Sequence, residues 1–148
     1  MPDGDSGNWL AIDYGERTIG LAVAHPMTGS ARPLEPLRNT GEETVDKALL
    51  ELIRQWSPTR LVIGLPLDGQ GNDTLMSRKV RAFADRLARQ CPKVSISLQD
   101  ERLSSQAAAS EFAQRRSQGR ARRRDAARLD SLAAAQILDS WIREHDNA

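Results

Sequence analysis

The feature that most constrains the fold is a pair of continuously apolar runs near the start of the chain, WLAIDY at 9–14 and IGLAVA at 19–24. Short runs of this kind are typical of strands that are covered on both faces of a sheet. The four residues between them, GERT, suit a tight turn. The two runs therefore predict an antiparallel hairpin inside a covered sheet.

The rest of the pattern alternates strands with amphipathic helices. A proline-containing segment over 31–37 suits a short third strand at a sheet edge. Apolar runs predict two more strands at 60–65 and 94–99. Apolar residues at helical spacing and capping residues predict helices at 42–56, 73–90, 105–117 and 125–144. This order predicts an α/β protein with a mixed five-stranded sheet, in which three antiparallel strands precede two parallel strands and helices flank both faces.

Length and composition limit the class of protein. The 148 residues suit one domain, which we expect over 9–144 after a disordered polar tail at 1–8. Hydrophobic residues at 39% and charged residues at 28% are typical of a soluble globular protein. No run approaches the ~20 apolar residues of a membrane span, and the N-terminus lacks the layout of a signal peptide. We therefore expect a cytoplasmic protein with no membrane partner.

The net charge of +1 conceals a concentrated positive segment. The window 115–128 holds seven arginines and a single acid, Asp125. Arginine pairs bidentately with phosphate and stacks on bases, so the segment favours nucleic-acid contact, although a solvated loop is the alternative. The candidate nucleic-acid-binding residues in this segment are Arg120, Arg122, Arg123, Arg124 and Arg128.

Two aspartates lie where a carboxylate is costly to bury. Asp13 sits inside an apolar strand, and Asp130 shares a helix face with Ala134, Ile137 and Trp141. Each needs a cation or hydrogen-bond donors close by. For Asp13, backbone donors in the following turn are the alternative to a metal or phosphate site at a strand end.

A third acid comes from the adjacent pair Asp100 and Glu101, at the end of the strand over 94–99. Adjacent strand residues face opposite ways, so only one of them joins a site with Asp13. We favour Glu101, with Asp100 as the alternative. Asp13, Glu101 and Asp130 would then resemble a two-metal nuclease site holding one or two Mg²⁺ or Mn²⁺ ions, since an all-oxygen ligand set suits hard cations.

Two arginines accompany these acids. Arg17 and Arg102 lie beside the proposed carboxylates in the sequence. Each is a candidate contact for substrate phosphate, and pairing with a neighbouring carboxylate is the alternative.

Four blocks together carry a family resemblance: IDYGERTIGLAVA with TGSARPL, then VIGLPLDG, DERLSS and LDSLAAAQIL. In this order, over about 9–142, they resemble the YqgF family of Holliday-junction-resolvase-like proteins, regarded as pre-16S rRNA nucleases. The resemblance implies an RNase H-like fold and metal-dependent phosphodiester hydrolysis. It also implies a cytoplasmic role in maturing the 5′ end of 16S rRNA, with precursor rRNA and the pre-ribosomal particle as partners.

The family's motifs fall on the acids selected above. Its first-strand acid corresponds to Asp13, its DER motif to Asp100-Glu101-Arg102 and its final-helix acid to Asp130. In one respect this chain departs from the junction-resolving relatives, which carry a second acid at the end of the fourth strand. Here that strand ends at Gly64-Leu65-Pro66, so the site must take its acid from the fifth strand.

Several functions fit these features. The favoured one is a metal-dependent endonuclease acting on precursor rRNA, as a monomer or homodimer. A four-way DNA junction as substrate would require a dimer with two sites in symmetric register. An RNA-binding assembly factor without turnover would share the same sequence features. The first hairpin also resembles the phosphate-binding hairpin of actin-like ATPases, but those proteins need a second, related domain that 148 residues do not supply.

Overall fold

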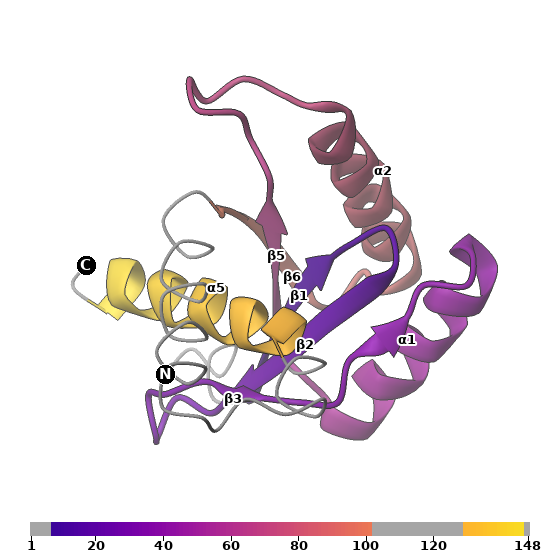
Figure 1. Ribbon diagram of the computed structural model, residues 1–148. Coiled ribbons are helices and arrows are strands. Elements are labelled where there is room, and N and C mark those ends of the chain that lie inside the picture. Colours follow the sequence, from indigo (N-terminus) through magenta and orange to yellow (C-terminus); the bar gives the residue numbers. More distant parts are fainter. Residues whose placement is uncertain (1–6, 102–128, 147–148) are drawn as a thin grey trace, which may run out of the picture.

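The computed structural model describes residues 7–101 and 129–146, without the side chains of residues 129, 130 and 146 (Figure 1). Its strands are β1 (Trp9–Tyr14), β2 (Thr18–Ala24), β3 (Arg32–Pro33), β4 (Leu37–Arg38), β5 (Arg60–Leu65) and β6 (Ser95–Asp100). Its helices are α1 (Glu42–Trp56), α2 (Leu75–Gln90) and α5 (Leu129–Asp146). These bounds agree closely with the predicted hairpin and with the predicted strands and helices that follow it.

The six strands form one mixed sheet in the order β3-β2-β1-β5-β6, and β4 also pairs with β2. β1 and β2 are antiparallel, and Asp13 lies opposite Gly20 in their register. β5 runs parallel to β1, and β6 runs parallel to β5. The carboxyl ends of β1, β5 and β6 therefore meet at one edge of the sheet, which is where open α/β sheets place their ligands.

The third predicted strand is wrong in detail, because the segment 31–37 does not form one strand. It forms two two-residue strands that pair with different parts of β2. Pro33 and Pro36 have no N–H to donate to a ladder, so a continuous pairing is interrupted. Between them, the backbone N–H of Leu34 donates to the carbonyl of Leu21, which keeps the chain against the sheet edge.

Helices cover both faces of the sheet. α1 and α2 pack on one face around a core that includes Leu49 and Phe83, whereas α5 crosses the other face (Figure 1). Ile137, Leu138 and Trp141 on α5 are buried against that second face. Side chains alternate between the faces along each strand, so the face of every strand residue follows from its neighbours. Within the described residues, no helix is long and apolar enough to cross a bilayer.

Asn8 and Asp139 make hydrogen bonds that fasten segments outside the sheet. Asn8, placed in the predicted tail, bonds the backbone of Trp56 and Thr59, and so joins the folded part of the chain. Asp139 is partly buried and accepts the backbone N–H of Ala31 at 3.0 Å, which fastens α5 to the segment before β3. The predicted helix at 105–117 and the start of the last predicted helix lie outside the described residues.

Candidate active site

An open cleft of about 630 Å³ lies at the carboxyl end of β1. Asp13 and Glu101 are the acids predicted for a common site, and both line it. Arg17 lines the same cleft, from the turn between β1 and β2. Its other lining residues are Tyr14, Gly15, Glu16, Thr18, Pro66 and Met76. The structure therefore brings three of the predicted site residues together.

Asp13 and Glu101 meet across a glycine on the strand between them. Trp9 and Ala11 pack under α5, so strand alternation turns Asp13 to the α5 face as well. A Cβ added to Gly64 on β5 would lie 2.7 Å from Cγ of Glu101 and 2.6 Å from Cδ1 of Ile137. The space that a side chain at position 64 would fill is therefore occupied by Glu101 and by α5. The end of β5, which carries no acid, makes room for the acid that follows β6.

The contact between the two carboxyl groups changes their protonation. Burial raises the pKa of Glu101 from 4.5 to about 8, and the negative charge of Asp13, a hydrogen bond to Asp13 and the charge of Asp100 add to the effect. Near neutral pH, Glu101 therefore keeps its proton beside Asp13. Two carboxyl groups that meet in this way are suited to share a divalent cation in place of that proton.

The structure says less about the other two acids named for the site, Asp100 and Asp130. Asp100 is the last residue of β6 and, unlike Glu101, is not among the residues that line the cleft. Asp130 is the second residue of α5, and its side chain lies outside the described residues. Its neighbour Ser131 is buried and accepts the backbone N–H of Leu21 at 3.2 Å. Because Leu21 follows the residue paired with Asp13, the first turn of α5 lies near the carboxylate pair.

Within the described side chains, no group of three acids, histidines or cysteines gathers that could hold a metal ion. Asp13 and Glu101 are two candidate ligands, and Asp130 stays a predicted third. The other predicted nucleic-acid contacts lie outside the described residues: Arg102, Arg120, Arg122, Arg123, Arg124 and Arg128.

Asn39 fixes the turn that carries Arg17, a role that the sequence analysis missed. Its side-chain amide donates to the carbonyl of Gly15 at 2.8 Å, and its backbone N–H donates to the carbonyl of Arg17 at 2.8 Å. A Cβ on Gly15 would lie 2.4 Å from the carbonyl oxygen of Thr18, so only glycine fits this turn. An asparagine just before a helix has a common capping role, which hid this contact in the sequence.

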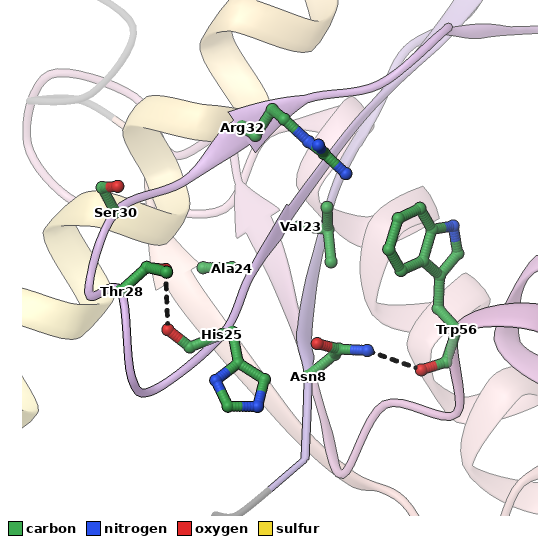
Figure 2. A pocket seen from close by; sticks show the side chains of 8 residues that line it. All are labelled: Asn8, Val23, Ala24, His25, Thr28, Ser30, Arg32 and Trp56. Atoms are coloured by element: carbon green, nitrogen blue, oxygen red, sulfur yellow. Dashed lines mark hydrogen bonds between the residues drawn. The ribbon is translucent and has the colours of Figure 1, made fainter.

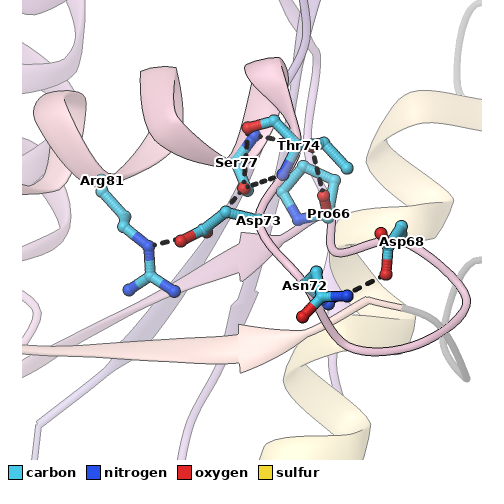
Figure 3. Close-up of polar contacts among 7 residues, drawn as sticks. All are labelled: Pro66, Asp68, Asn72, Asp73, Thr74, Ser77 and Arg81. Carbon is cyan, nitrogen blue, oxygen red and sulfur yellow. Dashed lines mark hydrogen bonds and ion pairs between the residues drawn. The ribbon is translucent and has the colours of Figure 1, made fainter.

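The opposite wall of the cleft is the loop from β5 to α2, held by polar side chains (Figure 3). Asp68 accepts two backbone N–H groups within the loop. Thr74 and Ser77 form a capping box at the start of α2, and the Thr74 hydroxyl also donates to the carbonyl of Pro66. Asp73 accepts hydrogen bonds from Ser77 and Arg81. These bonds fix the positions of Pro66 and Met76 in the cleft wall.

His25 lies at the other end of the sheet, in the wall of a separate cavity of about 290 Å³ (Figure 2). Its Nδ1 accepts the backbone N–H of Met27 at 3.0 Å, and its carbonyl accepts hydrogen bonds from Thr28 and Gly29. His25 closes the turn after β2, directly before Pro26. At that distance along β2, it has no access to Asp13.

Gly64→Ala tests the close approach of Glu101. The added methyl group must displace Glu101 or Ile137, so we expect a loss of about 2 kcal/mol, or about 5 °C in Tm. Moving Glu101 away from Asp13 should also lower the pKa of Glu101, measured by NMR titration of its carboxyl carbon. Gly69→Ala is the matched control, because a Cβ there meets nothing within 4 Å. An unchanged Tm and an unchanged Glu101 titration would contradict the packing described here.

Comparisons with known proteins agree on one family. A family model described as RuvX, Holliday junction resolvase, matches residues 7–144. The protein named "Putative pre-16S rRNA nuclease" from Edwardsiella ictaluri is 39% identical over 134 residues, covering 90% of this chain and 92% of that protein. A protein of the same name from Xylella fastidiosa is 39% identical over 148 residues, covering 97% and 95% of the two chains.

Solved structures share the fold at low identity. Thermus thermophilus RuvC in complex with a Holliday junction substrate superposes with a TM-score of 0.57 at 17% identity, covering 95% of this chain and 96% of that chain. The fowlpox virus Holliday junction resolvase superposes with a TM-score of 0.55 at 10% identity, covering 93% and 99%. At these identities the likeness concerns the fold alone.

Proposed function

The chain belongs to the RuvX Holliday junction resolvase family, and from this premise we propose that it is a divalent-metal-dependent endonuclease of precursor ribosomal RNA. The membership confirms the resemblance predicted from the four sequence blocks, and the RuvC-like neighbours confirm the predicted fold class. The names of the curated relatives and the resolvase-like family support a nuclease. The finer proposal is cleavage that matures the 5′ end of 16S rRNA, which would take place in the cytoplasm.

One observation carries this proposal: the carboxyl groups of Asp13, on β1, and of Glu101, directly after β6, meet in an open cleft, where burial and the charge of Asp13 raise the pKa of Glu101. Keeping like-charged groups together costs stability, and such arrangements are concentrated at functional sites. A divalent cation fits this donor set, because it would replace the proton on Glu101 and neutralise both carboxylates. Asp13 and Glu101 would hold it, with Asp130 as the proposed third ligand.

The residues of the cleft have distinct tasks in the proposed reaction. When bound, a divalent cation supplies a Lewis acid that activates water and stabilises the charge that develops on the phosphate. Asp13 and Glu101 would hold the cation in the cleft, and the proton on Glu101 would pass to solvent as the cation binds. Arg17 is exposed at the rim, where its guanidinium can pair with phosphate oxygens of the substrate. Asn39 keeps that arginine beside the carboxylates by holding the turn.

The substrate is tested by comparing two nucleic acids under identical conditions. We expect the purified protein, with Mg²⁺ or Mn²⁺, to cleave RNA that carries the 16S 5′ precursor sequence. A synthetic four-way DNA junction should be cleaved at least about tenfold more slowly. Cleavage products are resolved on denaturing gels, and a scrambled RNA of equal length controls for non-specific hydrolysis.

The other outcomes separate the alternatives. Faster cleavage of the junction would assign a resolvase, which also requires a dimer, measurable by analytical ultracentrifugation. Tight RNA binding with no cleavage of either substrate would assign a non-catalytic assembly factor. Either result overturns the proposed rRNA endonuclease.

A further inference from the structure

A second cavity, of about 270 Å³, adjoins the cleft between α1 and α2. Tyr14 lines both cavities, so its side chain forms the wall that they share. α2 also borders both: Met76 lines the cleft, and Lys79, one helical turn further, lines the second cavity. A groove therefore leads from the carboxylates, past Tyr14, onto α2. We call it the α2 groove and define it by its lining residues, which are Tyr14, Glu42, Lys79, Ala82 and Arg86.

The wall of the α2 groove is held rigidly by a buried ion pair. Arg86 donates to both carboxylate oxygens of Asp46, at 3.0 and 3.3 Å, and so joins α2 to α1. It also hydrogen-bonds the side chain of Tyr14, whose ring packs on Phe83 with 4.4 Å between ring centroids. Because Tyr14 follows Asp13 directly, this network fixes the boundary between the groove and the carboxylate site.

The basic side chains of α2 differ in whether an acidic side chain already pairs with them. The helix carries five basic residues, Arg78, Lys79, Arg81, Arg86 and Arg89, and one acid, Asp85. Arg81 pairs with Asp73, and Arg86 is neutralised by Asp46 and by Glu42 at 3.7 Å. Lys79 is exposed and forms no ion pair with any of the described residues. It is therefore the cation in the groove that is available to a ligand.

We propose that the α2 groove binds the nucleic-acid strand next to the cleaved bond, with Lys79 pairing with the phosphate of the adjacent nucleotide. This inference rests on the proposed nuclease function. A strand with its phosphate at Asp13 and Glu101 extends beyond the cleft, and the groove offers a continuous path lined by a tyrosine and an unpaired cation. An acidic peptide does not match the groove in this way, because its backbone has no phosphates that repeat along the chain. It would bring its carboxylates to the carboxylates of the cleft and would place no phosphate at Lys79.

The test measures binding without turnover. A fluorescein-labelled, 12-nucleotide single-stranded RNA is titrated in EDTA, and anisotropy is followed between 50 and 200 mM KCl. For Lys79→Ala, we expect about five- to tenfold weaker binding at 50 mM KCl and a salt slope shallower by about 0.7, as for one lost phosphate contact on a single strand. Lys79→Arg should restore both values.

Arg89→Ala is the matched control, because it removes one exposed positive charge from the same helix, about 15 Å further from the cleft. It should change neither affinity nor slope. If Lys79→Ala and Arg89→Ala weakened RNA binding equally, or if Lys79→Ala did not weaken it at all, the α2 groove would be excluded as the binding path. Because the assay needs no cleavage, a protein that binds as expected but never cleaves RNA would overturn the nuclease proposal alone.

Discussion

Replacing Asp13 by asparagine is expected to reduce cleavage of the 16S precursor by at least about 1000-fold. The substitution keeps the shape of the side chain but removes the charge that a divalent cation would neutralise. Burial and the charge of Asp13 keep the proton on Glu101 near neutral pH. Single-turnover rates at saturating enzyme, with Mg²⁺ and with Mn²⁺, separate the chemical step from binding.

The fold of this variant should remain intact, because asparagine keeps the shape of the side chain and removes the cost of partly burying a negative charge. Its Tm is therefore expected to equal or exceed that of the wild type. Asp85→Asn is the matched control, since Asp85 is exposed on α2 and lies outside the cleft. A rate for Asp13→Asn within about threefold of the rate for Asp85→Asn would remove Asp13 from the reaction.

The sequence predicts the core of this fold well, because its strands are short apolar runs and its helices have a clear apolar face. The hairpin of β1 and β2, the helix α1 and the strand β5 begin and end within a residue of their predicted bounds. The edge of the sheet is different. Two-residue pairings such as β3 and β4 depend on which backbone groups reach β2, and alternation of residue types does not encode that.

The sequence likewise predicts only part of the candidate site. Strand alternation allows only one of Asp100 and Glu101 to join a site with Asp13, and the favoured residue, Glu101, lines the cleft. The means by which Glu101 reaches Asp13 is not visible in the sequence, because it depends on the empty space above Gly64 on the intervening strand. The raised pKa of Glu101 follows from that proximity and from burial, both of which are properties of the folded chain. Asn39 also acquires its role only from tertiary contacts.

Replacing Glu101 by glutamine should have two opposite effects. We expect loss of cleavage by at least about 1000-fold, since a proposed cation ligand is removed. We also expect a metal-free protein that is more stable at high pH. The pKa of Glu101 in the folded chain is about 8, above its ordinary value of 4.5. Its contribution to stability is therefore complete below about pH 4.5 and is lost as the pH rises through 8.

Glutamine never acquires this charge, so the variant should keep the stability that the wild type loses. At pH 8.5 in EDTA, we expect a gain of about 2 kcal/mol, or about 5 °C in Tm, after allowing for solvent screening of a partly exposed side chain. At pH 4.5 the two Tm values should coincide. Glu43→Gln, which changes an exposed carboxylate on α1, is the control and should show no such dependence on pH.

Mn²⁺ should raise the Tm of the wild type at pH 8.5 and leave the Tm of the Glu101 variant unchanged, because only the wild type exchanges its proton for a cation. Equal stabilisation of both proteins by Mn²⁺ would contradict the role of Glu101 as a ligand, even if cleavage were lost.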